Sequence, residues 1–178
     1  DPYDRRQADE LLEGSSSGRA MRILGDLAGD RDTGVAARAI LALAADGGPE
    51  ACAILRGRFE QESRRPVRQS LLAAMGACEE PETAELVRIL TEDRDMGMRS
   101  AAAIALGRRG DRTALPALLQ ALRDPDMAVR TRAIAAVRRI TGQDFDYNPG
   151  MGGATRVSRK LGAMGASPFL LEGKLSDP

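Results

Sequence analysis

One sequence segment recurs four times along the chain, at intervals of 31 or 32 residues. The copies begin at Val35, Val67, Met98 and Val129 and read VAARAILALAADG, VRQSLLAAMGACE, MRSAAAIALGRRG and VRTRAIAAVRRIT. Aligned apolar positions lie four residues apart within each copy, as they do on one face of an α-helix. Because a short helix cannot bury its apolar face alone, the copies are expected to stack against one another around a shared core.

A second amphipathic stretch precedes each copy, at about residues 19–27, 49–59, 81–90 and 113–122. We call these stretches the A segments and the repeated copies the B segments. An aspartate stands before three B segments and a glycine follows three of them: Asp32, Asp95 and Asp126, and Gly47, Gly110 and Gly142. Such aspartates cap helix N-termini, and such glycines end helices in the left-handed conformation. The pattern predicts four helical hairpins in an all-α protein.

The stretch ALPALLQALRDPDMAVRTRAIAAVRRITG, at residues 114–142, resembles a HEAT repeat of the short bacterial type that is also seen in phycobilisome lyases. The features that carry the resemblance are Pro116 inside the first helix, Asp124 before the turn and Val129-Arg130 at the start of the second helix. The resemblance covers residues 18–142 and implies a right-handed α-solenoid of about four hairpins. Around it we expect an N-terminal capping helix within residues 1–17 and an extended, glycine-rich C-terminal tail at residues 143–178.

The resemblance also implies a structural ladder, in which the acid of one repeat bonds the arginine of the next. Acids at the corresponding position are Asp30, Glu62, Asp93 and Asp124, and the arginines that follow six residues later are Arg68, Arg99 and Arg130. The first repeat departs from this pattern, because Ala36 stands where the arginine is expected.

The composition excludes several kinds of active site. The chain has no histidine and only two cysteines, which removes imidazole bases, Ser-His-Asp systems and four-thiolate zinc sites. No apolar run approaches the ~20 residues that cross a bilayer. Only Phe59 is aromatic within the repeats, which disfavours base flipping or stacking on nucleic acid. We therefore expect no catalytic residue and no cofactor, and we expect protein partners rather than nucleic acid.

Charge divides between the two helix layers although the net charge is zero. With the adjoining turns included, the B segments (residues 31–47, 63–79, 94–110 and 125–142) hold 13 arginines and five acids. The A segments counted in the same way (residues 18–30, 48–62, 80–93 and 111–124) hold seven arginines and 12 acids. B helices line the concave side in proteins of this resemblance, which predicts a basic concave face for an acidic partner. The candidate partner-binding residues are Arg65, Arg108, Arg109, Arg132, Arg138 and Arg139. Structural pairing of these arginines, or binding of nucleic-acid phosphates, remains an alternative.

Two smaller constellations carry specific chemistry. Cys52 and Cys78 fall at about the same height on one antiparallel hairpin, so they form either a disulfide or two buried, small apolar side chains. Asp144, Asp146 and Asn148 match the first three ligand positions of a calcium loop. That loop requires glycine and glutamate where Pro149 and Thr155 stand, which favours an ordinary exit from the last helix.

The function expected from the sequence is a non-catalytic interaction scaffold, an accessory or structural subunit of a larger bacterial assembly. The tail would dock on a partner through Phe169, Leu170 and Leu171, or fold back along its own solenoid. The alternative suggested by the resemblance is a bilin lyase or a chaperone-like subunit. A bacterial source is indicated by the basic residues, of which only Lys160 and Lys174 are lysine. The compartment stays open, with the periplasm or cell envelope favoured over the cytoplasm.

Overall fold

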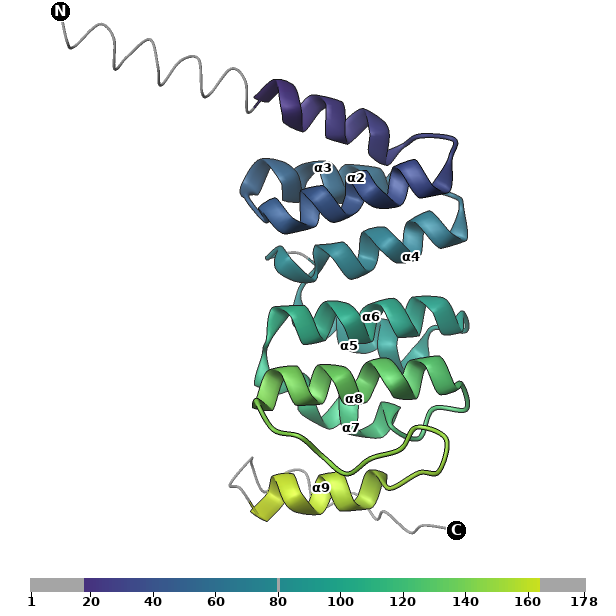
Figure 1. Ribbon diagram of the computed structural model, residues 1–178, viewed down its shortest axis with the longest axis vertical. Helices are drawn as coiled ribbons and strands as arrows, with labels where there is room; N and C mark the ends of the chain where they lie inside the picture. Colours follow the sequence, from purple (N-terminus) through teal and green to yellow (C-terminus); the bar gives the residue numbers. More distant parts are fainter. Residues whose placement is uncertain (1–17, 80, 164–178) are drawn as a thin grey trace, which may run out of the picture. The chain divides into compact units, whose positions relative to one another are not determined.

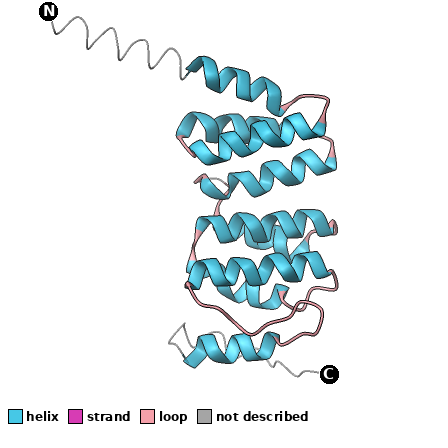
Figure 2. Cartoon of the chain, in the orientation of Figure 1, coloured by secondary structure: helices cyan, strands magenta, loops and turns pink. Residues whose placement is uncertain are grey.

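The computed structural model describes residues 18–79 and 81–163, which form helices joined by loops (Figures 1 and 2). The chain divides into two compact units, Asp1–Cys78 and Glu79–Pro178, which we call the N-terminal unit and the C-terminal unit. The predicted capping helix within residues 1–17 lies outside the described residues, as does the tail beyond residue 163.

The N-terminal unit contains two helical hairpins. A helix at residues 18–28 pairs with α2 (Thr33–Asp46), and α3 (Pro49–Gln61) pairs with α4 (Arg65–Ala74), which continues into the 3-10 turn η1 (Met75–Ala77). Helix α2 packs against both α3 and α4. The shared core consists of apolar side chains, including Met21, Ala36, Ala39, Ile40, Leu43, Leu55, Val67 and Leu71. Ala39, Leu43, Val67 and Leu71 are aligned apolar positions of the sequence repeat, so the predicted hairpin core is confirmed here. Met21 and Leu55 come from the A helices.

The C-terminal unit repeats this arrangement. Helix α5 (Thr83–Glu92) pairs with α6 (Met96–Arg109), and the 3-10 turn η2 (Arg112–Ala114) with α7 (Leu115–Ala121) pairs with α8 (Met127–Thr141). Helices α6 and α8 lie side by side in one layer, and α5 and α7 form the layer behind them (Figure 1). A Cβ atom on Gly107 would lie 2.9 Å from the Cα and Cβ atoms of Ala136, so glycine lets the two B helices approach closely.

The helix ends predicted from the sequence are confirmed in three of the four hairpins. The Oδ1 atoms of Asp32, Asp95 and Asp126 accept backbone N–H groups at the starts of α2, α6 and α8, and Gly47, Gly110 and Gly142 end these helices in the left-handed conformation. The second hairpin differs at both ends. Arg64 occupies the N-cap position of α4 without a side-chain cap, and the segment ends at Cys78 rather than at a glycine.

The predicted A helix at residues 113–122 is shorter than expected. Pro116 lies in the first turn of α7 rather than in a helix interior, and the residues before Leu115 form the 3-10 turn η2. The physical reason is that proline lacks the backbone N–H that an interior helical position requires. Asp111 caps the 3-10 turn by accepting the N–H of Thr113 at 2.9 Å.

The expectation of an extended tail is wrong for residues 154–163, which form helix α9 (Ala154–Ala163) against α7. Ala154, Val157 and Leu161 are buried there. Their spacing of three and four residues is that of an amphipathic helix, which the surrounding glycines obscure in the sequence. This part of the chain therefore folds back onto its own last repeat, which was one of the two alternatives for the tail.

Candidate interaction surface

An arginine–carboxylate pair joins the last two hairpins. The Nε and Nη2 atoms of Arg99 donate to the carboxylate of Asp124 at 2.8 and 3.0 Å, and Nη1 donates to the carbonyl of Asp93 at 3.0 Å. Burial raises the pKa of Asp124, but the Arg99 hydrogen bonds, an amide hydrogen bond and nearby positive charge outweigh it, so this pKa is lowered overall. The acid comes from the later hairpin and the arginine from the earlier one, which reverses the order that the resemblance implied.

The first hairpin lacks this arginine and replaces it from another position. Nη1 of Arg64 donates to the carbonyl oxygens of Asp30 and Arg31 at 2.6 and 3.2 Å, and its Nε and Nη2 atoms donate to Glu62 at 3.0 and 2.8 Å. Arg99 has equivalent acceptors two repeats later in the chain, because the carbonyl of Asp93 corresponds to that of Asp30 and the carboxylate of Asp124 to that of Glu62. Hydrogen bonds from Arg64 lower the pKa of Glu62 from 4.5 to about 2. An arginine at the N-cap of α4 thus compensates for Ala36.

The other two ladder arginines bind backbone carbonyl groups. Nη1 of Arg68 donates to the carbonyl of Phe59 at 2.8 Å, and its guanidinium lies 4.1 Å from the centre of the Phe59 ring. Arg130 donates to the carbonyl oxygens of Asp124 and Pro149, both at 2.6 Å. Arg130 therefore connects the last hairpin to the segment that leads into α9.

Arg138, predicted as a partner-binding residue, also holds this segment. It forms an ion pair with Asp144 at 2.8 Å and donates to the carbonyl of Phe145 at 2.8 Å. The Tyr147 hydroxyl donates to the carbonyl of Leu122 at 2.6 Å, and burial raises the Tyr147 pKa. These contacts fix the Phe145 and Tyr147 rings in the core, so residues 144–161 close the end of the last repeat.

The three candidate calcium ligands each have a different partner. Asp144 pairs with Arg138, Asp146 lies 3.9 Å from Arg156, and Oδ1 of Asn148 accepts the N–H of Gly150 within its own turn. Within residues 18–79 and 81–163, acidic and cysteine side chains form no group of three or more that could hold a metal ion.

The outward face of α6 and α8 carries exposed apolar side chains at one end and arginines toward the other. We call the set Met96, Ile104, Arg108, Met127, Arg132 and Arg139 the B surface. Met96 and Met127 are 57% and 59% exposed. The side chains of Arg108, Arg132 and Arg139 make no hydrogen bond or ion pair with any other described residue. Because Arg108 and Arg139 lie 31 residues apart, they occupy equivalent places on neighbouring helices.

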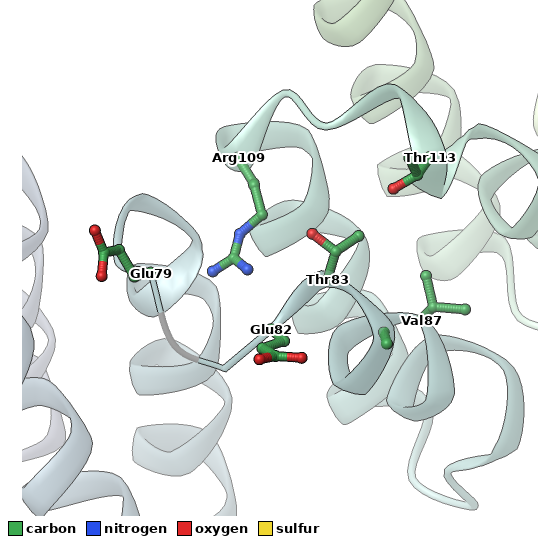
Figure 3. Close-up of a pocket in the computed structure, with 7 residues that line it drawn as sticks. Glu79, Glu82, Thr83, Val87, Arg109 and Thr113 are labelled. Carbon is green, nitrogen blue, oxygen red and sulfur yellow. The ribbon is translucent and has the colours of Figure 1, made fainter.

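The remaining predicted cations lie elsewhere. Arg109 points into a hollow of about 620 Å³ at the end of the α5–α6 hairpin, near Glu79, Glu82 and Thr83 (Figure 3). Arg65 is exposed at the first residue of α4 in the N-terminal unit. Phe169, Leu170 and Leu171 lie outside the described residues. The structure thus brings together three of the six predicted partner-binding arginines.

A disulfide joins Cys52 of α3 to Cys78, whose Cα atoms are 5.6 Å apart. It links the start of one helix of the second hairpin to the residue that follows η1. The other three hairpins end at a glycine, whereas the second hairpin ends at the disulfide-bonded Cys78.

These features define a helical-repeat protein in which arginine contacts join the two hairpins within each unit. A family model for HEAT repeats matches residues 1–76 and 82–146, and the chain therefore belongs to the HEAT-repeat family. HEAT repeats generally serve as protein-interaction scaffolds. None of the curated proteins compared with the chain matches it. No helix among the described residues is both long enough and apolar enough to cross a membrane.

Proposed function

We propose that the protein is a non-catalytic scaffold, an accessory subunit of a larger bacterial assembly, that binds an acidic protein partner through the B surface. The observation that carries this proposal is the set Arg108, Arg132 and Arg139, whose side chains have no partner among the described residues and which share the B surface with the exposed Met96 and Met127. Arg64 and Arg99, by contrast, are paired with carboxylates of the chain itself. Three unpaired cations on one face therefore favour an external partner.

The chemistry of the B surface fits an acidic protein segment with apolar side chains. Arginine binds carboxylates through two parallel hydrogen bonds, which gives both affinity and orientation. Methionine is flexible and polarizable, so it adapts to the partner's apolar groups. Clustered positive charge also raises the association rate, in a manner that salt suppresses.

The C-terminal residues complete the proposal. We expect a second contact with the assembly through Phe169, Leu170 and Leu171, which lie outside the described residues. Deleting residues 164–178 should release the protein from its assembly, and circular dichroism checks that the truncated chain keeps its helices. Retention of the assembly after this deletion would contradict the docking role of the tail.

Crosslinking mass spectrometry of the tagged chain in its source cells identifies the partner, and charge reversal tests the surface. We expect Arg108→Glu, Arg132→Glu and Arg139→Glu together to remove the crosslinked partner. Arg88→Glu, Arg94→Glu and Arg112→Glu form the matched control, because these exposed arginines lie in the same unit outside the B surface. Equal loss of the partner in both variants would refute the B surface, and a covalent coloured adduct with bilin would overturn the non-catalytic role.

A further inference from the structure

A second surface, in the N-terminal unit, has the features of a small-ligand site. A hollow of about 400 Å³ is lined by Gly29, Arg31, Arg58, Gln61, Glu62 and Arg64. It lies where the turn that joins helix 18–28 to α2 meets the C-terminal end of α3 and the turn that leads into α4. It belongs to the N-terminal unit, whereas the B surface belongs to the C-terminal unit, so the two share no residue.

The lining contains three guanidinium groups and one carboxylate. Glu62, whose side chain is 10% exposed, receives two hydrogen bonds from Arg64, so these two charges neutralise each other. Arg31 and Arg58 remain without a comparable partner. The side chain of Arg31 makes no hydrogen bond or ion pair with any other described residue. The lining residues therefore carry an excess of positive charge, although acids that do not line the hollow, Asp26 among them, stand beside these arginines.

Arg58 has only a weak partner. Its nearest carboxylate belongs to Asp26, at 3.5 Å, and the Asp26 side chain is 88% exposed. An ion pair this long with a solvated acid contributes little. The Gln61 side chain likewise has no hydrogen bond to another described residue, so its amide adds a neutral donor beside the two cations.

Gly29 determines where the Arg58 guanidinium lies. A Cβ atom at residue 29 would lie 2.5 Å from Nη1 and 3.0 Å from Cζ of Arg58. Any larger residue would therefore displace the guanidinium, which is the mobile end of a long side chain. The absence of a side chain at Gly29 places this cation against the wall of the hollow.

We propose that this hollow binds an oxyanion group, a carboxylate or a phosphoryl group, between the guanidinium groups of Arg31 and Arg58. The planar arginine fork donates two parallel hydrogen bonds to either group, and the Gln61 amide supplies a further donor. The volume exceeds that of one such group, so the hollow accommodates part of the molecule that carries it. The site goes beyond the scaffold role, because it gives the N-terminal unit a ligand of its own.

Isothermal titration calorimetry of the full chain at low ionic strength tests the site, with inorganic phosphate and succinate as separate probes. We expect saturable binding of at least one probe, and the one that binds identifies the group. Arg58→Gln and Arg31→Gln should each weaken this binding about tenfold. Arg22→Gln is the matched control, because it removes one exposed charge from helix 18–28 in the same unit.

Gly29→Ala separates a built site from general attraction of anions. It removes no charge and displaces the Arg58 guanidinium, so we expect binding to weaken several-fold while the circular-dichroism melting midpoint stays within a few degrees. The proposal is overturned if neither probe saturates by about 50 mM. It is equally overturned if Arg22→Gln weakens binding as much as Arg58→Gln, or if Gly29→Ala leaves the affinity unchanged.

Discussion

Replacing Arg99 by alanine tests the contact between the third and fourth hairpins. Arg99 donates to both oxygens of Asp124, at 2.8 and 3.0 Å, and to the carbonyl of Asp93 at 3.0 Å. The two side chains are only 14% and 9% exposed. Removing one member of a buried ion pair costs about 3–5 kcal/mol, because the remaining charge stays desolvated. Partial access to solvent places Arg99→Ala at the low end of that range, about 3 kcal/mol.

Urea unfolding followed by far-ultraviolet circular dichroism measures this loss, since the chain has no tryptophan for fluorescence. With a denaturant slope of about 2 kcal/mol per molar, we expect the midpoint to fall by about 1.5 M. Arg88→Ala is the control, because Arg88 is exposed on α5 in the same unit and should change the free energy of unfolding by less than about 0.5 kcal/mol.

A double-mutant cycle isolates the pair itself. Asp124→Asn removes the charge but keeps an oxygen that accepts the N–H of Asp126, a bond of 2.9 Å in the native protein. We expect Arg99→Ala and Asp124→Asn to be coupled by about 2 kcal/mol. If the two effects add to within about 0.5 kcal/mol, the ion pair is not what stabilises this junction, and the account of the ladder is refuted.

Three further predictions concern the N-terminal unit. Arg64→Asp should lower the melting temperature, and adding Ala36→Arg should restore it, because the pair recreates the cap and the arginine of the other hairpins; an uncompensated double variant would contradict this exchange. Glu62 has a folded-state pKa of about 2 against 4.5 when unperturbed, so its stabilising contribution is complete above pH 4.5 and is lost as the pH falls toward 2. Melting temperatures of Glu62→Gln should therefore depend less on pH in that window, and an unchanged profile would contradict the assignment. Replacing both cysteines by alanine should lower the free energy of unfolding by about 3.5 kcal/mol in urea titrations, from the 26-residue separation of Cys52 and Cys78; no change would mean that the bridge does not restrict the unfolded chain.

The repeat pattern predicted the hairpins because each copy carries its own helix signals. Asp95 and Gly110 bracket α6 both in the sequence and in the structure, and the aligned apolar residues form the core. Helix α9 was missed because Gly150, Gly152 and Gly153 precede it and Gly162 lies in its last turn. Its buried residues nevertheless recur at helical spacing, and that signal was present in the sequence.

The contacts of individual arginines could not be predicted from position in the repeat. Arg64 stands at an N-cap position and makes the contacts that an arginine at position 36 would make if the first repeat had one. Only the three-dimensional path of the chain reveals this replacement. Arg138 occupies a helix end that looked like a partner surface, yet it binds the segment after its own helix. Side-chain reach across a turn decides these contacts, and a one-dimensional alignment carries no information about it.

The number of arginines in the B segments is therefore larger than the number that a partner can bind. Five of their arginines (Arg64, Arg68, Arg99, Arg130 and Arg138) bind carbonyl or carboxylate groups of the chain itself. In the C-terminal unit this leaves Arg94, Arg108, Arg109, Arg132 and Arg139, of which Arg108, Arg132 and Arg139 belong to the B surface. Two of these cations repeat at the interval of the hairpins, so a partner gains most when its acids match that interval. Specificity would then depend on the order of charges along the partner rather than on its total charge.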